Sequence, residues 1–291
     1  MKQRGGAWNT IGGLIRLVRP LNCVMIFAGT YAGGIIINRF RAFDWPDNYD
    51  LLLAAASAAL VGAGANAIND VFDVTSDAVN RPDRPIPRGA VTILAAGATW
   101  LLLTGAGIAV GFGVSVLHGQ IAFGVAALMY LYSARLKFIP ILGNMVVGAS
   151  VSAALAYGAL ALGRFEPVIP AVLFAFLTNL AREVIKDVQD IRGDAVQNVR
   201  SLPVLKGSGA GVVIFFVLIA FTIVLTPVPY AVLGYGGLYL LLILFADGVL
   251  LAALWSGLRQ QEENFAGRAS ALVKVAMVFG LVALSLAGVV G

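Results

Sequence analysis

The chain consists largely of long apolar runs that carry almost no charge. A transmembrane helix needs about 20 consecutive, mostly apolar residues to cross the hydrocarbon core of a bilayer. Only 12% of the residues are charged, against about 25% in soluble globular proteins. The runs long enough to span fall at about residues 20–38, 50–70, 92–113, 117–134, 140–161, 168–187, 209–228, 230–254 and 269–290. The sequence therefore predicts an all-α polytopic membrane protein, with nine transmembrane helices in one bundle around a central cavity.

The positions of the basic residues predict how the bundle is oriented, because cytoplasmic segments of membrane proteins carry an excess of Lys and Arg. With the N-terminus in the cytoplasm, all of the 20 basic residues except Arg39, Arg41 and Arg164 fall on the cytoplasmic side. The same signal explains the net charge of +5 without any binding of nucleic acid. We expect residues 1–291 to form one domain. Residues 1–19 would be a short cytoplasmic helix lying in the membrane interface, or else a frayed terminus.

Two short stretches concentrate the acidic residues of the chain. They begin at Asn66 and Glu183, and they hold eight of the 15 carboxylates. On a helix that continued through each stretch, three aspartates would share one narrow stripe. These are Asp70, Asp73 and Asp77 in the first stretch and Asp187, Asp190 and Asp194 in the second, 117 residues later. Four predicted spans lie between the two sets, so we expect both to emerge on the same, cytoplasmic face.

Carboxylates gathered in this way repel one another and need a compensating charge. A solvated loop with salt bridges to arginines is one source of it. However, each cluster begins at the end of an apolar helix, where ionisable groups are costly and usually functional. Oxygen ligands without paired His or Cys favour Mg²⁺. The only histidine, His118, falls in an extracellular connection, and the only cysteine, Cys23, is expected to be a packed thiol in the first span.

Magnesium held by few carboxylates usually shares its coordination with a phosphate or diphosphate. Basic residues near the clusters fit such an anion, although membrane orientation alone would explain each of them: Arg81, Arg84, Arg88, Lys137, Lys186 and Arg192. An apolar helical chamber behind the anion suits a long apolar tail, so the predicted substrate is a polyprenyl diphosphate. The metal would neutralise the leaving group, the allylic C–O bond would ionise, and an acceptor would capture the cation away from water.

Four segments resemble motifs of the UbiA superfamily of intramembrane prenyltransferases. "NAINDVFDVTSD" (Asn66–Asp77) and "DVQDIRGD" (Asp187–Asp194) are similar to its paired aspartate-rich motifs. "YSARLK" (Tyr132–Lys137) is similar to the segment after its fourth helix, and "RPLN" (Arg19–Asn22) to the start of its first. The resemblance implies nine helices, dependence on Mg²⁺ with two ions, and a cavity open sideways to lipid.

The resemblance also implies roles for individual residues. One metal would be held by Asn66, Asp70 and Asp77, and the other by Asp190 and Asp194. Asp73 and Asp187 would be ligands, or would orient ligands. The four aspartates Asp70, Asp77, Asp190 and Asp194, together with Lys137, would be the catalytic set. Substrate binding would involve Arg19, Asn22, Asn66, Arg81, Arg84, Tyr132 and Lys186, with Lys137 and Arg81 on the diphosphate.

Three functions remain open. "AREVIKDVQDIRGD" (Ala181–Asp194) is most similar to the archaeal ether-lipid branch, which transfers geranylgeranyl from its diphosphate to a hydroxyl of geranylgeranylglyceryl phosphate. Arg19 or Lys186 would then hold the acceptor phosphate. The branch that prenylates aromatic acids of the 4-hydroxybenzoate or naphthoate type is the alternative, although it usually has a tyrosine and a doubled aspartate where Ile191–Gly193 stand here. A cation or metabolite transporter is favoured only by Asp247 within the eighth span, which is otherwise a hydrogen-bond acceptor between helices.

Overall fold

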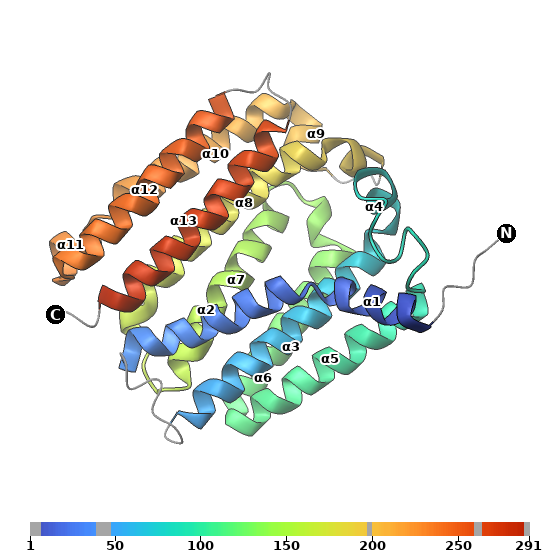
Figure 1. Cartoon of the computed structure of the whole chain (residues 1–291), viewed down its shortest axis with the longest axis horizontal. Coiled ribbons are helices and arrows are strands. Elements are labelled where there is room, and N and C mark those ends of the chain that lie inside the picture. The colour runs from blue at the N-terminus through green and yellow to red at the C-terminus, as the bar shows by residue number, and fades with distance from the viewer. Residues whose placement is uncertain (1–6, 39–47, 197–199, 259–263, 288–291) are drawn as a thin grey trace.

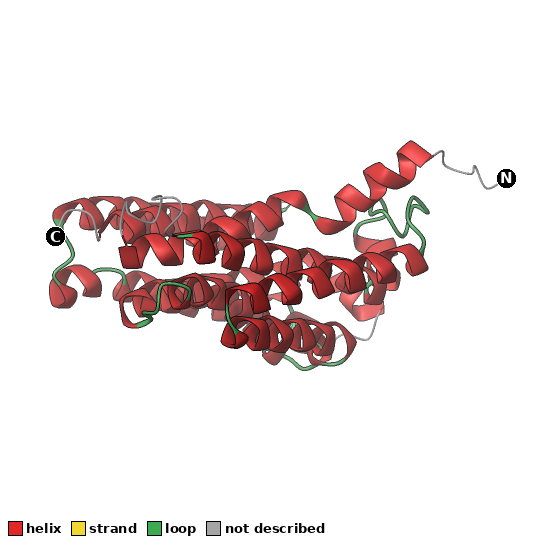
Figure 2. Ribbon diagram, turned by 90° about the horizontal axis from the view of Figure 1, so that it is seen from below, coloured by secondary structure: helices red, strands yellow, loops and turns green. Residues whose placement is uncertain are grey.

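The computed structural model describes residues 7–38, 48–196, 200–258 and 264–287, and every regular element in these ranges is helical. Nine helical stretches within these ranges are long and apolar enough to cross a membrane, which confirms the predicted number of spans. The long helices run side by side, with α1 at one end of the bundle and the last turns of α13 at the other (Figures 1 and 2). Five of the basic residues counted for orientation lie outside the described ranges: Lys2, Arg4, Arg39, Arg41 and Arg259.

The first four spans form one side of the bundle. They are α1 (Ala7–Val18) with α2 (Pro20–Asn38), α3 (Tyr49–Phe72), α5 (Ile93–Val114) and α6 (Val116–Ala134), and the short helix α4 (Val74–Asn80) follows α3. The helix expected within residues 1–19 is therefore present as α1. Helix α3 packs against both α2 and α5, and α5 packs against α6. His118 lies in the first turn of α6 and is buried, rather than in a connection, because Ser115 alone joins α5 to α6 and caps the new helix.

The remaining five spans begin with α7. The elements are η2 (Leu136–Phe138), α7 (Leu142–Leu160), η3 (Glu166–Val168), α8 (Ile169–Val196), α9 (Leu202–Lys206), α10 (Ser208–Leu225), α11 (Val228–Leu233), α12 (Gly237–Leu258) and α13 (Phe265–Ala287). Helix α8 packs against α7, α10 and α13, and its apolar side chains form a core with those of α10, α12 and α13. Its C-terminal end contacts α4 and α9, at the end of the bundle where α1 lies (Figure 1).

Two local predictions are wrong in detail. The eighth span does not begin near residue 230: the short helix α11 comes first, and the span is α12. The stripe of Asp70, Asp73 and Asp77 assumed one continuous helix, but α3 ends at Phe72 and α4 begins at Val74. The backbone N–H of Asp73 still donates to the carbonyl of Asn69, at 2.9 Å. The interruption is therefore slight, but the three carboxylates do not share one helix.

Helices α2 and α7 touch backbone to backbone. A Cβ on Gly33 would lie 2.0 Å from the carbonyl oxygen of Leu155, and one on Gly158 would lie 1.8 Å from that of Thr30. No side chain fits at either position, and small residues of this kind let membrane helices approach closely. Both contacts fall in the C-terminal halves of α2 and α7, so the two helices are fixed to each other at the ends remote from Arg19.

Candidate active site

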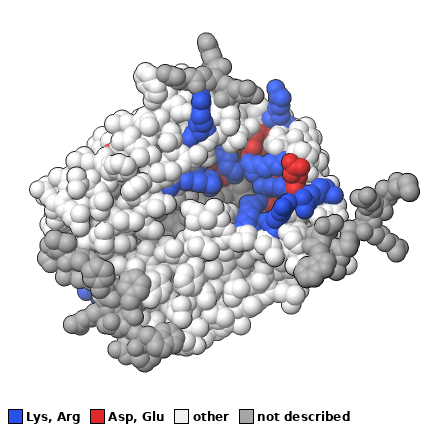
Figure 3. Space-filling model, viewed as in Figure 1, with Lys and Arg blue, Asp and Glu red and all other residues white. Residues whose placement is uncertain are grey.

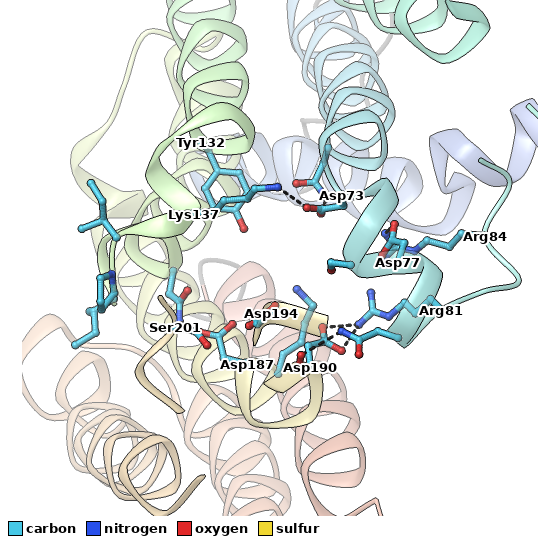
Figure 4. A pocket seen from close by; sticks show the side chains of 18 of the residues that line it. Asp73, Asp77, Arg81, Arg84, Tyr132, Lys137, Asp187, Asp190, Asp194 and Ser201 are labelled. Atoms are coloured by element: carbon cyan, nitrogen blue, oxygen red, sulfur yellow. Dashed lines mark hydrogen bonds and ion pairs between the residues drawn. The ribbon is translucent and has the colours of Figure 1, made fainter. Parts of the chain in front are cut away.

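A polar pocket of about 100 Å³ lies at the end of the bundle where α3, α4 and α8 finish. Five aspartates line it: Asp73 and Asp77 from the α3–α4 junction and α4, and Asp187, Asp190 and Asp194 from α8. Figure 4 shows the two groups reaching into the pocket from different sides, with Lys137 beside Asp73. The two acidic stretches therefore face each other, as their spacing and the even number of intervening spans predict.

Basic side chains balance these carboxylates in number. The pocket is also lined by Arg19, Arg81, Arg84, Lys137 and Lys186. Lys137 Nζ lies 2.5 Å from Asp73 Oδ1, and Arg81 Nη2 lies 2.8 Å from Asp190 Oδ2. Asp187 accepts a hydrogen bond from Asn144 Nδ2 at 2.8 Å, and within the described residues neither Asp187 nor Asp194 forms an ion pair. These two carboxylates thus remain available to a cation.

Asp70 does not line the polar pocket. It is 3% exposed and accepts hydrogen bonds from Arg19 and from Arg84, whose Nη1 lies 3.0 Å from Asp70 Oδ1. The same Nη1 lies 2.5 Å from Asp77 Oδ2, so Arg84 joins the two carboxylates. Burial raises the pKa of Asp77, and the charge of Arg84 opposes that shift. Asp70 therefore departs from the predicted stripe: Arg19 and Arg84 hold it, while Asp73 and Asp77 line the pocket.

Asn66 and Asn22 lie outside the polar pocket and line a second, larger cavity. Asn66 Nδ2 donates to the carbonyl of Val18 at 3.0 Å, and Asn66 Oδ1 accepts from Arg19 Nη1 at 3.4 Å. Asn66 therefore holds the junction between α1 and α2. At that junction Arg19 has a φ of 53°, a left-handed conformation that is unusual for a residue other than glycine and that clusters at functional sites.

The polar pocket includes residues that the sequence did not single out, above all Asn69, Asn80 and Asn144. Asn80 connects the two acidic stretches: its Nδ2 donates to the carbonyl of Asp190 at 3.1 Å, and its Oδ1 accepts from the backbone N–H of Gly193 at 3.0 Å. A Cβ on Gly193 would lie 2.1 Å from Asn80 Nδ2. Its position in the sequence is the one signal that could have identified Asn80. It follows Asp77 by three residues, so the two side chains are neighbours on the same helix.

The second cavity has a volume of about 740 Å³, within the usual range for small-molecule sites. Apolar residues of α2, α3, α6 and α7 form much of its wall, among them Met25, Val61, Ile121 and Val147. Six residues line both cavities, so the polar pocket opens directly into the larger one: Arg19, Asn69, Arg81, Arg84, Tyr132 and Lys186. In Figure 3 the charged side chains of this face gather around a hollow, and most of the rest of the face is uncharged.

The donor atoms of the polar pocket fit magnesium by their chemistry. They are carboxylate and amide oxygens, and neither His nor Cys belongs to the lining. Among the described residues, no three Asp, Glu, His or Cys side chains lie close enough together to hold a metal ion by themselves. Since Mg²⁺ is usually held by one or two carboxylates together with phosphate oxygens and water, this set suits a metal that arrives with a diphosphate.

Asp247, the residue that favoured a transporter, lies in α12 and lines neither cavity. It is 5% exposed and accepts a hydrogen bond from Thr226 Oγ1 at 2.7 Å. The carbonyl of Thr226 in turn accepts from the hydroxyl of Tyr239 at 2.6 Å. Asp247 thus joins α12 to the end of α10, which supports the interpretation as an acceptor between helices and removes the main argument for transport.

Comparison with known proteins gives a consistent result. Residues 26–288 match the UbiA prenyltransferase family. The digeranylgeranylglyceryl phosphate synthase of Methanopyrus kandleri is 39% identical over 273 residues, which cover 92% of this chain and 96% of that protein. The synthase of the same name from Thermococcus kodakarensis is 34% identical, covering 95% and 98%.

Solved structures agree with this result. A structure of a digeranylgeranylglyceryl phosphate synthase superposes with a TM-score of 0.75 at 27% identity, covering 96% of this chain and 99% of that one. A UbiA homologue from Archaeoglobus fulgidus bound to DMAPP and Mg²⁺ superposes with a TM-score of 0.69, covering 94% and 99%. Because its identity is only 18%, it shows the shared fold alone.

Proposed function

The chain belongs to the UbiA prenyltransferase family, and from that premise we propose that it transfers a geranylgeranyl group from geranylgeranyl diphosphate to geranylgeranylglyceryl phosphate, releasing pyrophosphate. The observation that carries the proposal is the direct opening of a charged pocket into a large, mostly apolar cavity. The charged pocket suits the diphosphate and its metal, and the cavity suits the prenyl chain. The relatives named for this reaction support the choice of acceptor.

We assign the binding of Mg²⁺ to the aspartates of the polar pocket, with Asp187 and Asp194 as its first ligands because neither is ion-paired within the described residues. When bound, the metal would neutralise charge on the leaving diphosphate. Asp77 and Asp190 would join them once the diphosphate displaces Arg84 and Arg81, which the aspartates now hold. Carboxylates lie on two sides of the pocket, which supports the prediction of two ions.

The basic residues of the pocket would bind the diphosphate through charge-assisted hydrogen bonds. Lys137 and Arg81 approach from α6–α7 and α4, and Lys186 stands on α8 where the two cavities meet. The bond between C1 of the prenyl chain and the diphosphate oxygen breaks, and its electron pair leaves with pyrophosphate. The acceptor oxygen forms the new C–O bond, and its proton passes to the pyrophosphate.

Tyr132 and the apolar wall would protect the allylic cation formed between these events. Tyr132 is the only aromatic residue among the described residues that line both cavities, so it stands where the charged end meets the prenyl chain. An aromatic ring attracts a nearby cation. The apolar wall of the cavity keeps water from capturing the cation before the acceptor does.

We further propose that the N-terminus and the polar pocket lie on the cytoplasmic side of the membrane. The support is the concentration of basic residues at that end of the bundle, including Arg81, Arg84, Arg88 and Lys137. Since the chain has a single cysteine, Cys23→Ala provides a background for new cysteines at exposed positions such as Asp83. Labelling of Asp83→Cys only after cells are permeabilised would support the proposal, and labelling in intact cells would contradict it.

The experiment that tests the reaction uses purified protein in detergent with Mg²⁺ and labelled geranylgeranyl diphosphate. We expect label to appear in geranylgeranylglyceryl phosphate, with one pyrophosphate released per ether formed. 4-Hydroxybenzoate, offered in parallel, should remain unlabelled. If only the aromatic acid becomes labelled, the acceptor is wrong. If neither is labelled and no pyrophosphate appears, the proposed reaction is wrong for both classes of acceptor.

A further inference from the structure

The larger cavity has a second basic region, on the wall formed by α8 and α13. Arg182 and Lys186 of α8 and Lys274 of α13 line it, together with Asn264 and Ser270. Only Lys186 also borders the polar pocket. The orientation signal placed Lys274 on the cytoplasmic side, and in the structure it lies within α13, nine positions after the helix begins at Phe265.

Glu183 fixes two of these three cations. Its Oε1 lies 2.8 Å from Arg182 Nη2, and its Oε2 lies 2.8 Å from Lys186 Nζ. Glu183 is 4% exposed, so the arrangement is built into the helix packing and does not depend on a flexible surface pair. Glu183 occupies the position that Asn66 has in the first acidic stretch, and Asn66 likewise holds a cation, Arg19, at the edge of the same cavity.

Lys274 has no such partner. No described residue accepts a hydrogen bond from it or forms an ion pair with it, although it lines the same cavity as Arg182 and Lys186. An ammonium group at this depth of an apolar helix is costly unless it faces a polar cavity or a partner. With three cations and one carboxylate, the wall carries an excess of two positive charges.

We infer that this wall binds the phosphate group of the acceptor, with Lys274 and Arg182 as its main contacts; the inference rests on the proposed function. A phosphate monoester carries about −1.5 to −2 charge at neutral pH, which matches the excess of the wall, whereas an aromatic acid carries a single carboxylate. The position also fits. In a glycerol with one ether and one phosphate, the free hydroxyl lies within two carbons of the phosphate ester. A phosphate beside Lys186 therefore places that hydroxyl at the mouth of the polar pocket, where C1 of the donor would lie.

The test compares Lys274→Met with the unchanged chain on two acceptors, geranylgeranylglyceryl phosphate and the same glycerol ether without phosphate. Loss of a hydrogen-bonded charge should lower kcat/KM for the phosphorylated acceptor by roughly 10- to 100-fold. The KM for geranylgeranyl diphosphate and the rate with the phosphate-free acceptor should not change. Lys274→Arg should restore much of the loss. Lys206→Met, at an exposed position that lines neither cavity, is the matched control.

The outcomes distinguish a wrong phosphate site from a wrong proposed function. If the unchanged chain uses the phosphorylated acceptor and Lys274→Met reduces both acceptors equally, or neither, the phosphate site is wrong and the proposed reaction stands. A wall that instead holds the headgroup of a bilayer lipid would also give no selective loss in lipid-free detergent. If the unchanged chain does not use the phosphorylated acceptor at all, the proposed function fails first. Elution of Lys274→Met at the native volume in size-exclusion chromatography excludes misfolding as the cause.

Discussion

The side-chain oxygen of Asn80 accepts a hydrogen bond from the backbone N–H of Gly193 at 3.0 Å, and this contact joins the two aspartate-rich stretches directly. Asn80 belongs to α4 and Gly193 to α8, 113 residues further along the chain. Asp190 and Asp194 flank Gly193, so their distance from Asp77 depends on this contact. A neutral amide and a glycine therefore help to set the width of the polar pocket, together with the ion pair of Arg81 and Asp190.

Gly193→Ala should impair catalysis more than folding. The new Cβ would lie 2.1 Å from Asn80 Nδ2, so Asn80 must move and the two groups of aspartates separate. A displacement of about 1 Å in an active site can cost about 10²-fold in rate, and we expect a fall in kcat of that order. Gly248→Ala, which faces open space in α12, is the control and should have near-normal activity. Equal activity of the two variants would show that the contact does not set the geometry.

Arg84→Met should lower both stability and activity. Asp70, whose side chain is 4% exposed, would keep only Arg19, and Asp77 would lose its ion pair. An unpaired buried group costs about 1–3 kcal/mol, so the melting temperature in detergent should fall by several degrees. Lys137→Met is the comparison, because Asp73 is more exposed and faces the pocket. It should reduce turnover with a smaller change in melting temperature. The reverse order would contradict the assignment of Arg84 as the link between Asp70 and Asp77.

Asp187→Asn and Asp194→Asn should each reduce activity by at least about 10²-fold, because both carboxylates are assigned to the metal. A chelator should abolish the activity of the unchanged chain, and added Mg²⁺ should restore it. Asp83→Asn is the matched control: Asp83 is exposed and does not line the polar pocket. In isothermal titration of Mg²⁺ with pyrophosphate, the two pocket variants should bind the metal more weakly than the unchanged chain. Asp83→Asn should bind it as tightly as the unchanged chain. Undiminished metal binding by either pocket variant would remove that residue from the ligand set.

Ala154→Phe should shorten the prenyl chain that the protein accepts. Ala154 lines the larger cavity one residue before Leu155, whose carbonyl meets Gly33. Each CH₂ group that can no longer be buried costs about 0.8 kcal/mol, so excluding a few of them should lower kcat/KM for geranylgeranyl diphosphate by about 10²-fold. The rate with dimethylallyl diphosphate should be retained. Ala149→Phe, on an exposed face of α7, should leave this preference unchanged. A uniform loss with both donors would place the prenyl chain elsewhere.

Much of the fold follows from the sequence, because the bilayer requires long apolar helices and their number can be counted. The convergence of Asp73 and Asp77 with Asp187 and Asp190 also follows, from helical spacing and an even number of spans. Hydropathy does not predict the break at Asp73, since one residue outside the helix leaves the apolar pattern intact. Nor does it predict that Asp70 stays outside the pocket lining, where Arg19 and Arg84 hold it.

Other parts of the site depend on contacts between distant segments. Asn80 has no special pattern around it, and its role exists only because α4 packs on α8. In the sequence, Lys274 is only one of the basic residues that indicate orientation. The packing of α13 against α8 shows that it also lines a cavity. The choice among several arginines for each carboxylate likewise depends on distance in space. Spacing along the chain predicts which types of residue come together, and the packing of the helices determines which side chains contact one another.

The crossing of α2 and α7 at Gly33 and Gly158 holds together two helices that line the larger cavity. The cavity residues of α2, such as Met25 and Ile26, precede the crossing, and those of α7 end at Tyr157. A Cβ on either glycine would meet a backbone carbonyl of the other helix, so any atom added there drives the helices apart. During evolution, a change in product length is therefore expected at side chains that line the cavity, such as Ala154 and Tyr157 of α7, and not at these glycines. The spacing of α2 and α7 is thus inherited with the fold, and the side chains that line the chamber remain open to selection.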